Sequence, residues 1–191
     1  MADLVSFDMK DALLQIEKLE SKVRYEQDNL ALITELLELY NKTGKPEKAK
    51  FAAEQGLHQF QRNQLSASQG LRLVEAALEH WKLIKYTKKD SMRVNLSKER
   101  SSVLTEIKEC LIILARMNDP KLKQRINFHL AYVKECLGSF QDALSLLSDL
   151  ITVQASDGVE LSFIILRAAI LLQHLSGHAQ ALEYLEYLVD D

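Results

Sequence analysis

The stretch Gly44-Lys-Pro-Glu-Lys-Ala49 closes one segment of helical apolar periodicity and opens the next. Glycine readily adopts the left-handed conformation that ends a helix, and proline suits the first turn of the helix that follows. Ala49 is small enough to let two antiparallel helices approach closely. The stretch therefore predicts a helical hairpin with its turn at Gly44.

The same arrangement recurs further along the chain. It returns as Gly138-Ser-Phe-Gln-Asp-Ala143, and a copy shifted by one residue is Ser176-Gly-His-Ala-Gln-Ala181. A hairpin repeated along a chain indicates a solenoid, in which each unit buries its apolar face against its neighbours. A solenoid presents an extended surface to other molecules, so the repeats indicate a protein that holds or bridges partners.

The composition supports an all-α protein. Hydrophobic residues make up 47% of the 191 residues and charged residues 27%, which is typical of a globular domain, and only two prolines interrupt the pattern. The apolar periodicity predicts about nine helices in a single domain, residues 1–191. The expected parts are an extra N-terminal helix at 1–25 and hairpins at 28–60, 66–117, 121–153 and 157–190.

Three details of this layout are specific enough to check. The polar, basic stretch 87–96 is expected to be the longest loop, with Ser97 capping the fifth helix. Asp119-Pro120 predicts the start of the sixth helix, in the order N-cap then proline. Ser156 or Asp157 is expected to open the eighth.

Small and apolar residues lie at matching positions around the three turns. They are Ala49, Ala53 and Gly56 after the first turn, Leu130, Ala131 and Ala143 around the second, and Ala168, Ala169 and Ala181 around the third. This pattern resembles the tetratricopeptide repeat, a helix–turn–helix unit of roughly 34 residues. Lys134 stands where that family usually has an aromatic residue, so the resemblance is to a degenerate array. It implies a right-handed solenoid of antiparallel hairpins.

The resemblance also implies a function and a site. In that family the first helix of each hairpin lines a concave groove that binds a peptide or a helix. The corresponding positions here are Ala31, Thr34, Glu38 and Asn41 in one repeat, and Arg125, Phe128, Tyr132 and Glu135 in another. The implied function is a non-enzymatic protein-interaction module, scaffold or adaptor within a multiprotein complex.

The residues at the second set of positions support this site on their own. Phe128 and Tyr132 are four residues apart and share a helix face, with Arg125 one turn earlier. Aromatic residues beside an arginine are typical of protein-binding hot spots. The alternative, that both rings pack against a neighbouring hairpin, stays open. The predicted groove residues are Arg125, Phe128, Tyr132, Thr34 and Glu38.

Charge is segregated along the chain although the net charge is only -3. Residues 82–100 hold seven Lys or Arg and two acids, whereas the chain from Gly138 onward holds eight acids and one base. The predicted basic patch comprises Lys82, Lys85, Lys88, Lys89 and Arg93, beside the aromatics Trp81 and Tyr86. It indicates either a site for an anionic partner or a solvated loop, and the acidic balance of the whole chain argues against nucleic acid.

The sequence carries no motif that predicts an enzyme, a cofactor or a metal site. Cys110 and Cys136 fall within predicted helices, which favours thiols in a reducing compartment over a disulfide. No signal-peptide pattern opens the chain, and the most apolar stretch, 163–175, is interrupted by Arg167 and is too short to span a membrane. A cytoplasmic protein is expected, and the same features do not exclude the nucleus.

A second class of function follows from the two ends of the chain. The first predicted helix carries a heptad-like apolar seam, and the last, residues 179–189, has more apolar residues than one buried stripe needs. These ends indicate homo-oligomerisation, side-by-side packing as a scaffold subunit, or an array that continues. The seam consists of Val5, Met9, Ala12, Ile16, Leu19 and Val23.

Overall fold

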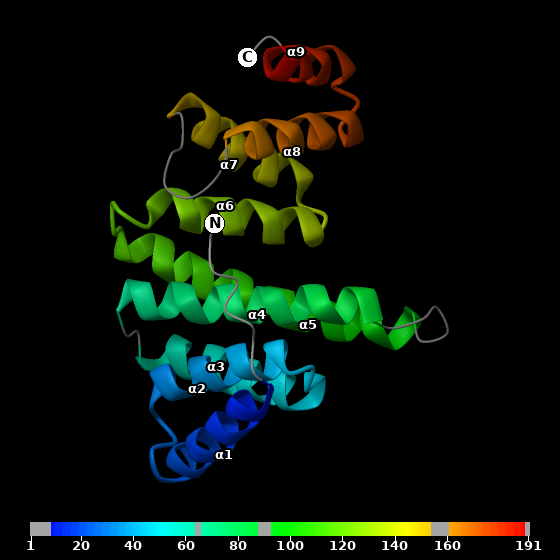
Figure 1. Ribbon diagram of the computed structural model, residues 1–191. Helices are drawn as coiled ribbons and strands as arrows, with labels where there is room; N and C mark the ends of the chain where they lie inside the picture. The colour runs from blue at the N-terminus through cyan, green and yellow to red at the C-terminus, as the bar shows by residue number, and fades with distance from the viewer. Residues whose placement is uncertain (1–8, 64–65, 88–92, 154–160, 190–191) are drawn as a thin grey trace, which may run out of the picture. The chain divides into compact units, whose positions relative to one another are not determined.

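The computed structural model describes residues 9–63, 66–87, 93–153 and 161–189 of the chain. Within these ranges all regular elements are helices, nine in number, which confirms the predicted all-α class (Figure 1). The helices are α1 (Met9–Tyr25), α2 (Leu30–Lys42), α3 (Pro46–Asn63), α4 (Ala67–Thr87), α5 (Arg93–Met117), α6 (Lys123–Cys136), α7 (Phe140–Thr152), α8 (Leu161–His174) and α9 (His178–Val189).

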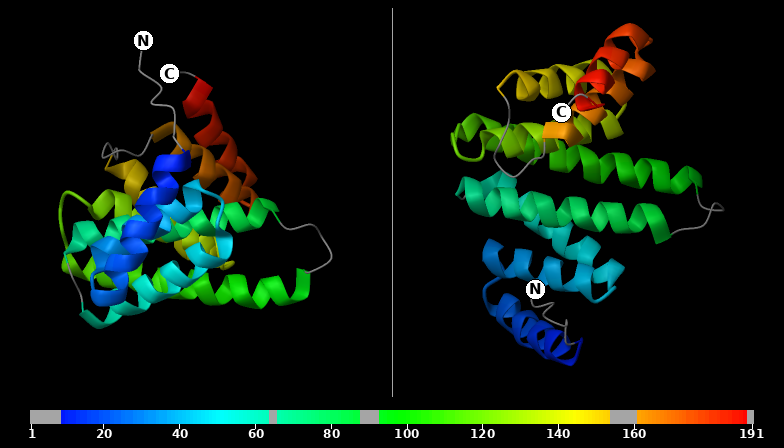
Figure 2. Two further views of the ribbon diagram at one scale, coloured as in Figure 1. Left: turned by 60° about the horizontal axis from the view of Figure 1, so that its bottom comes forward. Right: turned by 45° about the horizontal axis from the view of Figure 1, so that its top comes forward.

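The helices belong to two compact units, residues 1–100 and 101–191, and the division falls within α5. In the first unit α1 packs on α2, α2 and α3 form a hairpin, and α4 packs on both. In the second unit α6 pairs with α7 and α8 with α9, while α7 lies against α8 (Figure 2). The expectation that the whole chain is a single domain stays a prediction.

The three turns that the sequence repeats have the same hydrogen-bond pattern. The residue after each turn donates its N–H to a carbonyl five positions earlier: Lys45 to Tyr40 (2.9 Å), Ser139 to Lys134 (2.9 Å) and Gly177 to Leu172 (2.7 Å). The residue before each of these donors has a left-handed backbone, with φ of 66° at Gly44, 82° at Gly138 and 64° at Ser176. This combination is the Schellman motif. In the third copy serine, not glycine, occupies the left-handed position, which accounts for its one-residue shift.

The alanine after each turn lies at the contact between the two helices. Ala49, Ala143 and Ala181 donate their N–H groups to the carbonyls of the residues that follow the left-handed position, at 3.0, 3.0 and 2.9 Å. All three side chains are buried. Each turn therefore ends one helix and begins the next within a few residues, and a small side chain occupies the point of closest approach.

Gly56 marks a second close approach, in the middle of α3. A Cβ atom added there would lie 2.7 Å from Leu73 Cδ1 of α4 and 3.3 Å from Ile33 Cγ2 of α2. Both of those side chains are buried. The absence of a side chain at Gly56 thus lets α3 pack closely against both α2 and α4.

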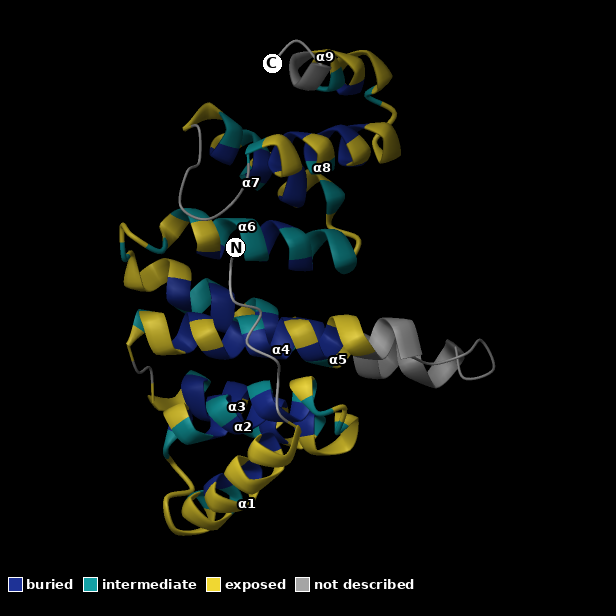
Figure 3. Ribbon diagram, viewed as in Figure 1, coloured by how far each residue is buried: buried dark blue, intermediate teal, exposed yellow. Residues whose placement is uncertain are grey.

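Each unit has an apolar core where its helices face one another (Figure 3). Fully burying one such aliphatic or aromatic side chain contributes about 1.5–3 kcal/mol, so these cores hold the hairpins together. In the first unit the largest fully buried side chains include Ile16, Leu30, Ile33, Leu37, Leu57, Phe60 and Leu73. The core of α6 to α9 comprises Ala131, Ala143, Leu144, Leu147, Leu150, Ile164, Ala168, Ala169, Leu171, Leu172 and Ala181.

Two helix starts differ from the prediction. α5 begins at Arg93, so Ser97 lies inside a helix and does not cap it. The stretch 93–96 reads Arg-Val-Asn-Leu and contains neither glycine nor proline, so its composition is compatible with helix. α6 begins at Lys123 because the Asp119 carboxylate accepts the N–H of Lys121 (3.0 Å) and builds a turn, not an N-cap. α8 begins at Leu161, and Ser156 and Asp157 lie outside the described residues.

The shared turn motif predicts opposite effects for two substitutions. A Cβ at Gly138 would meet nothing within 4 Å, so Gly138→Ala should cost only backbone strain, about 1 kcal/mol. Ser176→Gly should relieve the same strain and raise the free energy of unfolding by about 0.5 kcal/mol, the gain being reduced by the greater freedom of glycine in the unfolded chain. Urea denaturation measures both, and effects of equal sign would contradict the motif.

The single-domain expectation predicts one cooperative unfolding transition for residues 1–191. Calorimetry should then give a calorimetric enthalpy equal to the van't Hoff enthalpy. Two separate transitions would show instead that the two units unfold independently.

Candidate functional site

Arg167 of α8 lies between two aromatic rings and a carboxylate. Its guanidinium carbon is 4.8 Å from the centre of the Tyr132 ring and 5.8 Å from that of Phe163. The guanidinium also forms an ion pair with Glu135 of α6, and both side chains are largely buried. Since each charge has a partner, neither is left uncompensated in a partly dry environment. Arg167 therefore joins α8 to α6.

Phe128 of α6 reaches the same neighbouring helix. Its ring centre lies 5.9 Å from that of Phe163, with the planes inclined at 54°. Tilted ring pairs at this distance are favourable beyond the apolar area they bury. Phe128 also packs against the core of the α7–α9 helices. The rings of Phe128 and Tyr132 thus contact the next hairpin, which agrees with the alternative that both rings pack against a neighbouring hairpin. Both side chains nevertheless remain partly exposed.

Tyr132 is half-buried beside Arg167. Burial, assisted by the neighbouring Cys136 thiol, raises the pKa of the Tyr132 phenol above its ordinary value. A tyrosine hydroxyl is protonated at physiological pH even at its ordinary pKa, and the raised pKa keeps Tyr132 a hydrogen-bond donor at still higher pH. Arg125 is exposed one turn before Phe128 on the same helix.

α8 is apolar on its outer face as well as on its inner face. Phe163, Leu166 and Ile170 are spaced three and four residues apart and are 45%, 41% and 42% exposed. The residues on the opposite face, Ile164, Ile165, Ala168, Ala169, Leu171 and Leu172, are all buried. Surface helices normally carry polar residues on the outer face, so an apolar outer stripe makes this face of α8 a candidate interaction site.

These residues together form one candidate site, which we call the α6–α8 surface. Both helices that build it belong to the second unit, and in Figure 3 exposed segments alternate with buried ones along α8. The surface consists of Phe128, Tyr132, Glu135, Phe163, Leu166, Arg167 and Ile170.

The groove positions predicted in the first unit make internal contacts. Thr34 is only 2% exposed, and its hydroxyl donates to the Leu30 carbonyl of its own helix (2.8 Å). Glu38 accepts two hydrogen bonds from the Arg72 guanidinium of α4, each 2.7 Å long. Asn41 donates to the Ala76 carbonyl of α4 (2.9 Å), whereas Ala31 is exposed. Glu38 and Asn41 therefore fasten α2 to α4, and Thr34 has no surface to offer a partner.

The predicted basic patch falls largely outside the described part of the chain. Lys82 is exposed near the end of α4, and the neighbouring Trp81 is buried. Lys88 and Lys89 lie outside the described residues, as do the side chains of Lys85 and Arg93. The proposal of an anionic partner for this patch stays a prediction.

Sequence reasoning missed the outer stripe of α8. The stretch 163–175 drew attention only as a membrane-span candidate, and no helix within the described ranges is both long enough and apolar enough to cross a membrane. The available signal was the apolar character of this helix on all sides, with a single arginine among its residues. A helix at the surface buries only one stripe of its side chains. A helix that is apolar on all sides therefore exposes some apolar side chains.

The described residues hold no group of three or more His, Cys, Asp or Glu side chains placed to bind a metal ion. Cys110 is buried and Cys136 half-buried, and neither forms a disulfide. The α6–α8 surface offers apolar area, aromatic faces and one compensated ion pair.

No protein-family model matches the sequence, and no curated protein sequence matches it either. Among solved structures, a crystal structure of MamA protein superposes on 95% of this chain and 82% of its own with a TM-score of 0.65 at 12% identity. A second, of MamA, gives 0.64 at 12% identity over 97% and 95% of the two chains. A Podosopora anserina kinesin light chain with TPR-like repeats reaches only 0.40 at 16% identity over 94% of each chain, too low to support an inference. The fold is that of tetratricopeptide-like helical hairpins, and at such identities the likeness concerns the fold alone.

The position of Arg167 predicts measurable coupling between α6 and α8. A double-mutant cycle of Arg167→Met and Glu135→Gln should give a coupling energy of about 1 kcal/mol, because the pair is shielded from water. The matched control is the Lys134–Asp142 pair between α6 and α7, whose carboxylate is 62% exposed. Its coupling should be close to zero. Equal values for both pairs would show that shielding does not distinguish them.

Proposed function

We propose that this chain is a non-enzymatic protein-interaction module that binds a peptide or a helix of its partner on the α6–α8 surface. The outer stripe of α8 carries the proposal. Three exposed apolar side chains in one row, Phe163, Leu166 and Ile170, would lose their contact with water when a partner covers them. The described residues that flank the row contribute aromatic faces and an arginine, the residue types that dominate binding energy at protein interfaces.

The rigidity of the surface supports the same function. Arg167 is held by Glu135 and by two rings, so its position is set before a partner arrives. Side chains that are already ordered lose little conformational entropy on binding. The ion pair is also self-compensated, so covering it leaves no unpaired charge.

The placement of the helices is a further support. α6 and α8 are the first helices of the hairpins α6–α7 and α8–α9, and in the tetratricopeptide family the first helices line the binding groove. Because Thr34 and Glu38 are engaged within the first unit, the proposal rests on the second. The proposed setting, from the sequence, is a cytoplasmic multiprotein complex in which the chain acts as adaptor or scaffold.

Self-association is the second candidate function. α1 also exposes apolar side chains, Met9, Leu13 and Leu14, at 47%, 39% and 52%. A second copy of the chain would be an adequate partner for either this helix or the outer stripe of α8. Such pairing would make the solution mass depend on concentration.

The test uses a double variant on the outer stripe, Leu166→Glu with Ile170→Glu. Both side chains point away from the core, so the melting temperature should stay within a few degrees, while placing charges in the interface should weaken partner binding about 30-fold or more. Capture from a cell extract, read by mass spectrometry, compares wild type, the double variant and the control Val153→Glu. Val153 is an apolar residue just beyond α7 and is more exposed, at 59%, than Leu166 and Ile170.

A protein retained by wild type and by Val153→Glu but lost by the double variant supports the proposed surface. Identical retention by all three contradicts it. Sedimentation of the same variants separates the second candidate: a dimer of the wild type that becomes a monomer in the double variant assigns the stripe to self-association.

A further inference from the structure

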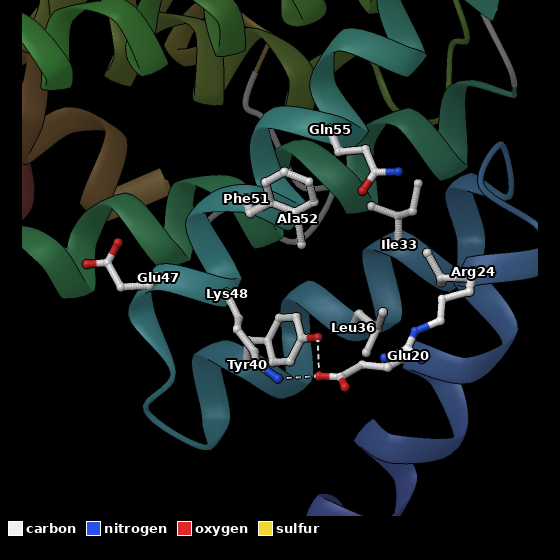
Figure 4. Close-up of a pocket in the computed structure, with 11 residues that line it drawn as sticks. Glu20, Arg24, Ile33, Leu36, Tyr40, Glu47, Lys48, Phe51, Ala52 and Gln55 are labelled. Carbon is white, nitrogen blue, oxygen red and sulfur yellow. Dashed lines mark hydrogen bonds and ion pairs between the residues drawn. The ribbon is translucent and has the colours of Figure 1, made fainter.

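A hollow of about 400 Å³ lies between α1, α2 and α3 in the first unit, and we call it the α1–α3 pocket (Figure 4). Its floor is apolar and consists of Ile33 and Leu36 of α2 with Ala52 of α3, all three buried. Its size falls in the range of small-ligand pockets, roughly 300–1,000 Å³. None of its residues belongs to the α6–α8 surface.

Phe51 of α3 stands at the edge of this pocket. Its side chain is 68% exposed, although phenylalanine is among the residues most often buried in folded proteins. In Figure 4 its ring faces the space in front of Ala52 and beside Ile33. An apolar group that enters the pocket can therefore contact both the Phe51 ring and the apolar floor.

The charges around the pocket cancel. The Glu20 carboxylate accepts a hydrogen bond from the Lys48 ammonium (2.6 Å) and another from the Tyr40 hydroxyl (2.8 Å). The hydrogen bond from Lys48 holds the pKa of Glu20 below its usual range and so favours the charged carboxylate. Arg24 and Glu47 add one charge of each sign at the rim. Because positive and negative charges around the pocket are equal in number, the complementary ligand is uncharged.

The side-chain oxygen of Gln55 is a hydrogen-bond acceptor at the apolar end of the pocket, beside Ile33 and Phe51 (Figure 4). The Gln55 side-chain amide donates to the Gln27 carbonyl (3.4 Å), which orients the amide. Its oxygen is thereby turned toward the space beside Ile33 and Phe51 (Figure 4). A hydrogen-bond donor on an otherwise apolar group would meet this oxygen.

We propose that the α1–α3 pocket binds a tryptophan side chain of a protein partner, with the indole ring against Phe51 and its N–H donated to the Gln55 oxygen. Indole has a large apolar body and a single donor, which are the two properties the pocket selects for. Tryptophan is also the most enriched of anchor residues at interfaces. This site is separate from the α6–α8 surface and does not depend on it.

Methyl NMR of the isoleucine-labelled full chain tests the site with indole as the probe. The Ile33 methyl lines the pocket, whereas Ile126 and Ile164 are buried in the second unit and serve as internal references. A saturable shift at Ile33 alone is expected, with a Kd on the order of 1 mM for a ligand of this size. No saturable Ile33 shift up to about 10 mM indole would overturn the proposal.

Variants then assign the two contacts. Phe51→Ala should weaken indole binding at least about fivefold, while Tyr25→Ala, which removes an exposed aromatic outside this pocket, should leave it unchanged. In wild type 1-methylindole, which lacks the donor, should bind about fivefold more weakly than indole. Gln55→Leu should abolish that difference. Equal losses for Phe51→Ala and Tyr25→Ala would place the indole elsewhere.

The source of the indole group is tested with N-acetyltryptophanamide, which presents it as in a protein chain. Shifts at Ile33 with an affinity within about threefold of indole support a partner's side chain. Binding of indole without binding of N-acetyltryptophanamide overturns that assignment, because the pocket would then admit only a free small molecule.

Discussion

The left-handed residue at the end of α2, α6 and α8 is the constraint from which the hairpin geometry follows. It turns the chain back so that the next amide closes a hydrogen bond to the carbonyl five residues earlier. The carbonyl of that same next residue then accepts the N–H of an alanine in the following helix. The two helices therefore start close together, and side chains larger than alanine would force them apart at Ala49, Ala143 and Ala181. Packing of the cores follows from this short connection.

A hairpin built in this way leaves one face of its first helix for other contacts. On α6 that face is used in part for α8, through Phe128, Tyr132 and the ion pair of Glu135 with Arg167. On α8 the outer stripe of Phe163, Leu166 and Ile170 lies opposite the buried face of the helix. Phe128, Tyr132 and Phe163 therefore take part both in packing and in the proposed binding surface, whereas Leu166 and Ile170 belong to that surface through their exposed side chains. The Phe128–Tyr132 pair is therefore a packing contact that also forms part of the proposed binding surface.

Local signals predicted the parts of the fold that depend on local chemistry. Glycine preference for positive φ located the turns at Gly44 and Gly138, and apolar periodicity located the helices between them. The errors arose where two local signals competed. Asp119 followed by proline is compatible with an N-cap and with a turn, and the hydrogen bond to Lys121 selects the turn. The basic composition before Ser97 suggested a loop, although its residues have ordinary helix propensity.

An all-α chain of close-packed hairpins, with small residues at the turns, follows from preferences that act over fewer than about ten residues. Which side chains face one another does not, because those contacts join residues far apart in the sequence. Arg167 and Glu135 are 32 residues apart, and Arg72 and Glu38 are 34 apart. Only the packing of whole helices brings them together, and the same packing buried Thr34 while leaving Phe163 and Ile170 at the surface. The candidate binding surface is for that reason a property of the tertiary structure.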